Sequence, residues 1–299
     1  MNILITGGSG FIGQRLCTLL VEKGHTPLVV SRSSERARRV LPEEAIVRTR
    51  VADFEEDAPE AVINLAGEPI AEGRWTDKKK KSIRDSRIYI TRDIVDLCAT
   101  LDEPPSVLVS ASAVGYYGDQ GSRDVTEETT PNDEFAHQIC SEWEAEACKA
   151  EQSGVRVAII RIGLVLDAGG GMLARMLPAF KLGLGGKLGD GKQYMPWIHR
   201  EDIVNMILFL LEKENLSGPF NASAPNPVTN AEFTRALGHA LNRPTVLPAP
   251  ALALKLAFGE MSRLLLTGAK MLPERMQQEG FEFRHARLDE ALNAIFGKQ

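Results

Sequence analysis

The sequence predicts an α/β fold built on a doubly wound parallel sheet, with a smaller, mostly helical lobe at its carboxyl end. Three observations indicate this fold. Apolar strand-like runs alternate with helix-like segments through residues 1–166, which is the pattern of βαβ units. Glycines separate the first strand from the first helix, and the last third changes to glycine-rich loops and proline-broken helices. At 299 residues, with 43% hydrophobic and 25% charged, the chain is long enough to bury a sizeable core.

The opening stretch NILITGGSGFIG, residues 2–13, predicts a phosphate-binding turn. A short apolar strand comes first, and leucines recur at helical spacing after Gly13 until Gly24 stops the helix. Glycines at 8, 10 and 13 fit the spacing G-x-G-x-x-G, which permits a tight turn, close approach of a pyrophosphate and close helix packing. The helix N-terminus supplies amide donors for the anion. The alternative is a glycine-rich turn in another α/β protein, but strand and helix flank it as a Rossmann-like dinucleotide site requires.

The end of the second predicted strand, residues 26–32, indicates which coenzyme is preferred. An NAD site usually has an acidic residue there, which binds the ribose 2′-hydroxyl. This chain has Ser31 and Arg32, followed by two more serines. A cation with hydroxyl neighbours favours a 2′-phosphate, so we expect NADP (NADPH) rather than NAD. The alternative is that Arg32 is an ordinary surface arginine.

Later segments extend the same pattern and divide the chain. The remaining strand-like runs are residues 61–67, 106–112 and 155–166, and the long helical stretches are residues 78–101 and 134–152. We expect an NAD(P)-binding domain over residues 1–166 and a C-terminal substrate lobe over residues 167–299, with some segments returning to the sheet. A further helix is predicted to start near Glu201. The lobe should close over the carboxyl ends of the strands, where open α/β sheets bind ligands.

Charge and composition limit the partners that we expect. The net charge of −5 argues against nucleic acid, and the basic run at residues 78–81 is interpreted as a solvated helix start. No apolar run reaches 18 residues, so we expect no membrane span and no membrane partner. The four cysteines lack zinc-site or disulfide spacing, which favours reduced thiols, a cytoplasmic location and no metal. The expected partner is a small molecule, sugar-like in one interpretation, bound by a monomer or homodimer.

At this point the motifs carry a family resemblance. TGGSGFIG, NLAG, SASAVGYYG, RIGLVL and PWIHREDI occur in that order along the chain. Together they resemble the extended short-chain dehydrogenase/reductase superfamily, and more narrowly its atypical NAD(P)-dependent, sugar-nucleotide epimerase-like branch. The resemblance covers nearly the whole chain, and it implies a Rossmann fold with a substrate lobe.

The resemblance also implies which residues hold the cofactor. It assigns the pyrophosphate to six residues of the opening turn: Gly7, Gly8, Gly10, Phe11, Ile12 and Gly13. It assigns the adenosine ribose to Ser31 and Arg32. Along the cofactor it places the run Leu65, Ala66 and Gly67. Arg87 is implied near the phosphates or the nicotinamide ribose, and Val165 near the nicotinamide; the alternatives are a surface arginine and simple core packing.

The chain departs from the superfamily where active members have a Tyr-x-x-x-Lys pair. In those enzymes the tyrosine exchanges a proton with the substrate, and the lysine one helical turn later lowers its pKa and binds the ribose. This chain has Ala136 and Cys140 at those positions. Ser112 matches the serine that polarises the substrate oxygen, and Tyr116 and Tyr117 follow it as candidate substitute acids.

Each surviving candidate has a structural alternative. The two tyrosines can serve only to pack or to hydrogen-bond, and Cys140 can be a small buried apolar residue rather than a nucleophile. His199 is the imidazole nearest the expected pocket, but structural hydrogen bonding is the favoured interpretation. Two functions follow from the sequence and the resemblance. One is an NADP-dependent nucleoside-diphosphate-sugar epimerase, or an oxidoreductase of unknown substrate, without the usual tyrosine and lysine. The other is an NADP(H)-binding redox sensor or regulatory protein that has lost the chemistry.

Overall fold

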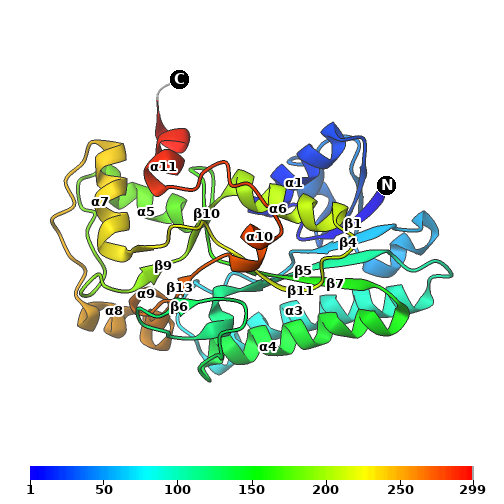
Figure 1. Cartoon of the computed structure of the whole chain (residues 1–299), viewed down its shortest axis with the longest axis horizontal. Coiled ribbons are helices and arrows are strands. Elements are labelled where there is room, and N and C mark those ends of the chain that lie inside the picture. Colours follow the sequence, from blue (N-terminus) through cyan, green and yellow to red (C-terminus); the bar gives the residue numbers. More distant parts are fainter. Residues whose placement is uncertain (298–299) are drawn as a thin grey trace.

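The computed structural model describes residues 1–297, and a seven-stranded parallel sheet forms its centre (Figure 1). The strand order is β11-β7-β5-β4-β1-β2-β3. The bounds of these strands are β1 Asn2–Thr6, β2 Thr26–Val30, β3 Ile46–Arg48, β4 Ala61–Asn64, β5 Val107–Ala113, β7 Arg156–Ile162 and β11 Gly218–Ala222. The order reverses direction beside β1, so the carboxyl ends of β1 and β4 flank the switch point where such sheets bind ligands.

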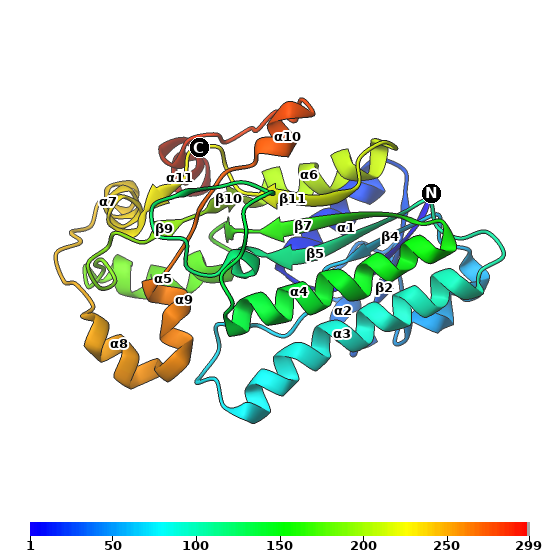
Figure 2. The same ribbon diagram turned by 60° about the horizontal axis from the view of Figure 1, so that its bottom comes forward.

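Helices cover both faces of the sheet (Figure 2). One face carries α1 Phe11–Glu22 and α6 Arg200–Glu212; the other carries α3 Asp77–Thr100 and α4 Phe135–Cys148. The alternation of strand side chains decides the split: Ile3 and Ile5 pack toward α1 and α6, whereas Leu4 packs toward α3. Because both faces are buried, the strands are apolar throughout, which confirms the predicted doubly wound α/β fold.

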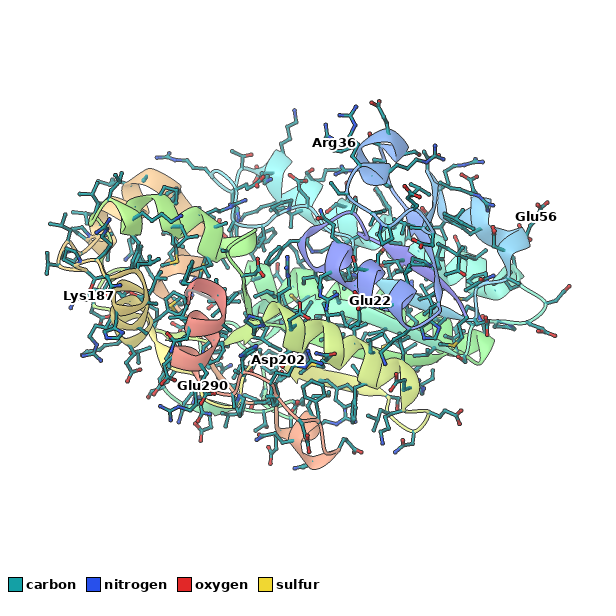
Figure 3. The ribbon with its side chains drawn as sticks, turned by 90° about the horizontal axis from the view of Figure 1, so that it is seen from above. Glu22, Arg36, Glu56, Lys187, Asp202 and Glu290 are labelled. Carbon is teal, nitrogen blue, oxygen red and sulfur yellow. The ribbon has the colours of Figure 1, made fainter. Side chains whose placement is uncertain are left out.

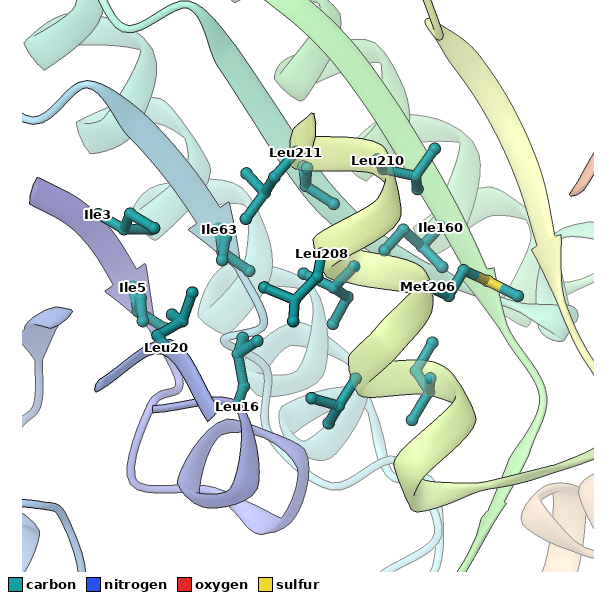
Figure 4. Packing of buried hydrophobic residues seen from close by; sticks show 14 of the residues in the cluster. Ile3, Ile5, Leu16, Leu20, Ile63, Ile160, Met206, Leu208, Leu210 and Leu211 are labelled. Atoms are coloured by element: carbon teal, nitrogen blue, oxygen red, sulfur yellow. The ribbon is translucent and has the colours of Figure 1, made fainter. Parts of the chain in front are cut away.

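The larger core lies between β1, β4, β7 and the helices α1 and α6 (Figure 4). Its members are fully or almost fully buried. Leu208 of α6 lies toward Leu16 of α1, whereas Met206 and Leu210 lie on the side of α6 near Ile160 of β7. Burying a side chain of this size contributes about 1.5–3 kcal/mol. This packing fixes α1, and therefore the glycine turn before it, against the sheet.

Several predicted elements differ in their bounds. The first helix begins at Phe11, two residues earlier than Gly13, so that glycine lies inside α1. The predicted strand over residues 155–166 is two strands, β7 and β8 (Leu164–Leu166), because Gly163 turns the chain out of the central sheet. A Cβ at Gly163 would lie 2.3 Å from the carbonyl oxygen of Pro196. Short elements were not predicted between the second and fourth strands: α2 Ser34–Arg38, β3 and the 3-10 helix Val51–Asp57.

The C-terminal part has a core of its own and also contributes to the sheet. Its helices are α5 Gly171–Lys181, α7 Asn230–Leu241, α8 Ala251–Phe258, α9 Arg263–Leu266, α10 Glu274–Gln278 and α11 Leu288–Phe296. Its short strands are β9 Tyr194–Met195, β10 Trp197–His199, β12 Val228–Thr229 and β13 Lys270–Met271, the last pairing with β6 Asp124–Val125. A third core gathers Trp197, Phe233 and Leu288. Strand β11 and helix α6 return to the central sheet from this half of the chain.

Candidate functional site

A crevice of about 420 Å³ opens at the carboxyl ends of β1, β2 and β4. Most of its lining comes from the glycine turn, the end of β2 and the loop after β4. The complete lining is Thr6, Gly7, Ser9, Gly10, Val30, Ser31, Arg32, Ser33, Arg36, Thr49, Leu65, Ala66, Gly67, Glu68, Ser86 and Ile90. Seven residues predicted from the sequence therefore meet in one crevice: Gly7, Gly10, Ser31, Arg32, Leu65, Ala66 and Gly67. The crevice lies at the switch point of the strand order.

The glycines of the turn divide into two groups by what surrounds them. Gly7 has a φ of +71°, and a Cβ there would lie 2.7 Å from the carbonyl carbon of Leu65. Gly10 caps α1 without a side-chain hydrogen bond, so the first amides of α1 have no side-chain acceptor at their cap. Gly8 and Gly13 do not line the crevice. A Cβ at Gly13 would lie 2.4 Å from the carbonyl oxygen of Gly7, so that glycine lets α1 pack on the turn.

The end of β2 and the helix α2 that follows each carry one guanidinium group into this crevice. Arg32 follows β2, and Arg36 is one turn into α2. Figure 3 shows Arg36 projecting from the surface at the end of the molecule that carries α1 and α2. Neither guanidinium forms an ion pair within residues 1–297. The hydroxyls of Ser31 and Ser33 lie beside them, so a doubly charged oxyanion would meet cations and hydroxyl donors together.

One carboxylate, Glu68, also lines the crevice, but it comes from the loop after β4 rather than from β2. Lys79 and Ser82 of α3 donate to it, and these hydrogen bonds hold the pKa of Glu68 below its usual range. Glu68 is therefore a charged carboxylate that is paired with Lys79 of α3.

Four other predicted cofactor residues are placed around the crevice without lining it. The ring of Phe11 packs against Gly170, and Ile12 packs on the main core. Arg87 donates through Nη2 to the Glu68 carbonyl at 3.1 Å and lies over the ring of Trp143, with burial lowering its pKa. Val165 pairs with Ile198 between β8 and β10. Arg87 thus anchors the loop that carries Gly67, which is a positioning role.

A buried polar network lies beneath the crevice and fixes it to the helices. Thr6 donates to Asn64 Oδ1 at 2.7 Å, and Asn64 Nδ2 donates to Thr91 Oγ1 at 2.8 Å. Trp143 Nε1 donates to the same Thr91 oxygen at 3.0 Å. These bonds join β1, β4, α3 and α4, so the strand ends that form the crevice are held by fully satisfied polar groups.

The three predicted catalytic residues belong to a second network around Arg161. Ser112 Oγ donates to Glu144 Oε1 at 2.6 Å, and Glu144 forms a salt bridge of 2.9 Å with Arg161. Tyr117 is fully buried; its hydroxyl donates to Asn221 Oδ1 at 2.7 Å and accepts from Arg161 Nη1 at 2.9 Å.

Burial raises the pKa of Tyr117 to about 12, despite the neighbouring guanidinium of Arg161. The side chain of Tyr117 has no exposed surface, so its phenol is enclosed in the core. Tyr116 is half-buried, with the Arg161 guanidinium 3.4 Å from its ring centroid, and its hydroxyl has no hydrogen bond within the described chain. Of the three candidates, Tyr116 alone keeps its oxygen available.

Helix α4 presents no replacement for the missing tyrosine and lysine. Ala136 and Cys140 face Gly115, where an added Cβ would lie 3.0 Å from the Ala136 Cβ and 3.7 Å from Cys140 Sγ. Burial, together with the charge of Glu144, raises the pKa of Cys140 to about 11. The thiol is therefore protonated at neutral pH, which supports its interpretation as a small buried apolar group.

Two adjoining cavities lie between α4 and the C-terminal lobe. The larger, of about 550 Å³, is lined by Trp75, Asp119, Asn132, Asp133, Glu134, Phe135, Ala136, Glu260, Arg263, Leu264 and Thr267. The smaller, of about 80 Å³, is lined mainly by apolar residues such as Val114, Leu164 and Met172, and it shares Leu264 and Thr267 with the larger one. Four carboxylates line the larger cavity, and its guanidinium, Arg263, is bound to Glu134 at 2.6 Å.

His199 forms a structural hydrogen bond, which is the interpretation that we favoured from the sequence. Its Nδ1 accepts the backbone N–H of Glu201 at 3.2 Å and so caps α6, and its ring lies 4.0 Å from that of His285. Burial and the neighbouring His285 lower the pKa of His199 to about 4. Asp202 accepts two backbone N–H groups at the start of the tail, those of Arg284 and His285.

Sequence reasoning missed Arg36 and Glu144. Arg36 was detectable, because it follows Arg32 by four residues and the short helix that carries it is capped by Ser33. Glu144 gave no local signal, because its partners Ser112 and Arg161 lie 32 and 17 residues away in the chain. Only the parallel pairing of β5 with β7 brings those two residues together, at the register Ser112 opposite Arg161.

The parallel sheet, the glycine turn and the switch-point crevice place the protein in the Rossmann class of dinucleotide-binding folds. Comparison with known proteins then defines the family. A model of the NAD dependent epimerase/dehydratase family matches residues 3–222, and a domain of unknown function matches residues 249–295. The chain belongs to the NAD dependent epimerase/dehydratase family.

Two curated relatives match almost the whole chain. An epimerase family protein of Mycobacterium bovis is 43% identical over 294 residues, which is 97% of this chain and 96% of the relative. The chloroplastic epimerase family protein SDR39U1 homologue of Arabidopsis thaliana is 41% identical, over 99% of this chain and 86% of the relative.

Solved structures agree with this fold. The human epimerase family protein SDR39U1, whose crystal structure contains NADPH, aligns over the full length of both chains, with a TM-score of 0.90 and 32% identity. A nucleoside-diphosphate sugar epimerase of Corynebacterium glutamicum aligns with 99% of this chain and 58% of its own, with a TM-score of 0.80 and 28% identity.

Proposed function

We propose that this protein binds NADP(H) in the crevice at the ends of β1, β2 and β4, and prefers it to NAD(H). The single observation that carries the proposal is that an open glycine turn meets two guanidiniums, which have no ion-pair partner within residues 1–297, in one crevice. The residues fit the cofactor at both ends: the backbone at Gly7 and Gly10 leaves room for a pyrophosphate, and Arg32 and Arg36 suit a 2′-phosphate. The NADPH in the human relative, 32% identical over both full chains, supports the same assignment.

In this proposal each part of the crevice has a defined task. The first amides of α1 donate to the pyrophosphate, and the macrodipole of α1 favours the negative charge. The guanidiniums of Arg32 and Arg36 bind the 2′-phosphate, and the hydroxyls of Ser31 and Ser33 donate to it. The loop after β4, anchored by Arg87, closes the side of the crevice. When bound, the coenzyme would supply or accept a hydride.

We further propose that the protein is an oxidoreductase or epimerase acting on a small carbonyl or hydroxyl compound. The adjoining cavities between α4 and the C-terminal lobe provide the space for such a substrate, about 550 Å³ in the larger one. Tyr116 is the proposed proton donor, because its hydroxyl has no other partner within residues 1–297. Ser112 is already bonded to Glu144, so its proposed role is to hold the network beside the site.

The charges of the larger cavity narrow the proposed substrate. Asp119, Asp133, Glu134 and Glu260 line it, and Arg263 is neutralised by Glu134. A diphosphate group placed among these carboxylates would lose its hydration and meet like charge. We therefore propose a sugar-like or other polar substrate without a phosphate of its own. The aromatic rings of Trp75 and Phe135, 4.8 Å apart, offer an apolar wall for it.

One observation favours the second candidate function, an NADP(H)-binding redox sensor. Two of the three hydroxyls predicted for catalysis are bonded within the core, and α4 offers an alanine and a protonated thiol in place of the tyrosine and lysine. A sensor requires the crevice but no acid.

One experiment separates these functions. The purified protein is titrated with NADPH and NADH by calorimetry, and then assayed for a change in nicotinamide absorbance with carbonyl compounds, polyols and nucleoside-diphosphate sugars. We expect tight NADPH binding and turnover that falls at least about a hundredfold in Tyr116→Phe, the lower end of a loss of general acid catalysis. Tight NADPH binding without turnover would favour the sensor, and equal affinity for NADH would contradict the coenzyme assignment.

A further inference from the structure

Six exposed apolar side chains gather at the end of the C-terminal lobe, on a surface called here the apolar tip. They are Leu182, Leu184, Val246, Leu247, Leu252 and Leu256. Their exposed fractions range from 51% for Leu247 to 75% for Leu182 and Val246. The ten large apolar side chains exposed within residues 1–297 thus include six at this tip. Apolar exposure that is grouped in this way marks a contact surface.

The tip is built from two hydrogen-bonded loops and the helix that follows the second loop. The loop after α5 runs beside the loop after α7: Ala249 N donates to the Lys187 carbonyl, and Arg243 Nε donates to the Lys181 carbonyl, at 2.9 and 2.8 Å. Helix α8 follows directly, and Leu254 is its buried member, while Leu252 and Leu256 face outward. Figure 1 places α7 and α8 at the end of the molecule opposite the N-terminus, and Figure 3 shows Lys187 projecting there.

The charges around the tip are mostly positive. Residues 181–190 and 243–258 contain four cations and one carboxylate, Asp190, although the whole chain has 35 Lys and Arg against 40 Asp and Glu. The cations Lys181, Lys187, Arg243 and Lys255 form no ion pair within residues 1–297. The tip is therefore a cationic region of an acidic protein, with its charges available to a partner.

A cavity of about 240 Å³ opens beside the exposed Val246 of the tip. Two cations, Lys187 and Arg235, line it together with Thr234 and Thr245. Thr234 is 3% exposed, and its hydroxyl has no hydrogen-bond partner in the described part of the chain. Cations, hydroxyls and an unsatisfied buried oxygen beside an apolar edge fit a phosphate-bearing headgroup.

We propose that the apolar tip binds the surface of an anionic phospholipid bilayer, with Leu182, Leu184, Leu252 and Leu256 entering the interface. The basic side chains bind headgroup phosphates, and their methylene stems lie along the acyl boundary. Within residues 1–297 no helix is long and apolar enough to cross a membrane, so this contact is peripheral. This proposal differs from our expectation from the sequence, which was that the protein has no membrane partner.

Charge also decides between a bilayer and a second copy of the chain. A symmetric dimer through the tip would bring two clusters of unpaired cations together, which costs energy through like-charge repulsion. The tip is formed by protruding loops and a short helix rather than by a groove for a helix or strand. Both features favour an anionic, deformable surface.

Vesicle sedimentation tests the proposal with the full chain. The wild type is sedimented with phosphatidylcholine vesicles and with vesicles containing about one third phosphatidylglycerol, in about 0.1 M salt. We expect binding to the anionic vesicles alone. Because each cation near such a surface contributes about fivefold to partitioning, Lys181→Glu with Lys255→Glu should weaken binding about 25-fold or more. Leu252→Gln with Leu256→Gln should also abolish sedimentation, because it removes the apolar insertion.

Matched changes elsewhere serve as controls. Val40→Gln alters an exposed apolar side chain, and Lys78→Glu with Lys213→Glu alters two exposed cations, all outside the tip. These variants should bind anionic vesicles as the wild type does, and circular dichroism should show all variants folded. Equal binding to both kinds of vesicle, no binding to either, or unchanged binding in the tip variants would overturn the proposal. So would a wild-type dimer that Leu252→Gln with Leu256→Gln dissociates in the absence of vesicles.

Discussion

Replacement of Arg32 and Arg36 by alanine should remove the preference for NADPH over NADH. The two guanidiniums line the same crevice, lie one helical turn apart in sequence and have no carboxylate partner within residues 1–297. Their positive charges are therefore available to a 2′-phosphate, which NADH lacks. We expect NADPH to bind more weakly in the variant while NADH is unaffected.

The size of the effect follows from the exposure of the two side chains. A charge-assisted hydrogen bond contributes about 1.5–3 kcal/mol, and both arginines are exposed, so the lower value applies to each. One replacement should then weaken NADPH binding about tenfold, since about 1.4 kcal/mol corresponds to a factor of ten. The double variant should lose somewhat less than about a hundredfold, because the two groups share one phosphate and their effects are not additive.

Calorimetric titration with each coenzyme measures the ratio of the dissociation constants for NADPH and NADH. The proteins to be titrated are the wild type, Arg32→Ala, Arg36→Ala and the double variant. Arg38→Ala is the matched control, because Arg38 lies on the same short helix, is exposed and does not line the crevice. An unchanged ratio in the double variant, or a wild type that binds NADH as tightly as NADPH, would refute the reasoning.

Three further predictions concern the scaffold of the site. Gly13→Ala should lower the free energy of unfolding by about 3 kcal/mol, because the new Cβ would lie 2.4 Å from the Gly7 carbonyl oxygen; urea unfolding measures this. Glu144→Gln should cost about 3–5 kcal/mol in the same assay, because it leaves the buried guanidinium of Arg161 without its counter-charge. His199 has a pKa of about 4 in the folded protein, against an ordinary value of 6.5, because of burial and the neighbouring His285. Below about pH 6.5 the unfolded chain therefore binds a proton at His199 that the folded chain does not bind. The free energy of unfolding should fall by up to about 3 kcal/mol between pH 6.5 and pH 4 for this reason. His199→Asn should remove this contribution of His199, and urea unfolding at each pH measures it.

Two of these predictions have a control variant close to the site. Glu142→Gln removes a carboxylate on the same helix as Glu144, but its ion pair with Arg84 is exposed on both sides, so the cost should stay below about 1 kcal/mol. Ser9→Ala changes the glycine turn without adding a Cβ and should leave stability within about 0.5 kcal/mol. Equal losses in Glu142→Gln and Glu144→Gln, or a pH dependence unchanged in His199→Asn, would contradict the burial arguments.

Local sequence determined the glycine turn after β1 and the strands of the sheet. Ile3 to Ile5 are apolar on both faces, and Gly7 after them has a φ of +71°, a conformation that few other residues tolerate. Such signals depend on neighbours within a few residues, so they can be read without the tertiary structure. The parallel sheet, its flanking helices and part of the crevice lining, including Gly10 and Arg32, followed from them.

Tertiary structure alone decided which side chains face a ligand and which are enclosed. Ser112, Tyr116 and Tyr117 are equally available in the sequence, yet only Tyr116 keeps its hydroxyl without a partner in the described chain. The partners of the other two, Glu144 and Asn221, lie 32 and 104 residues away and arrive through helix α4 and strand β11. The apolar tip likewise joins loops about 60 residues apart. Hydrogen bonding and burial depend on distances in space, and the packing of the whole chain sets those distances.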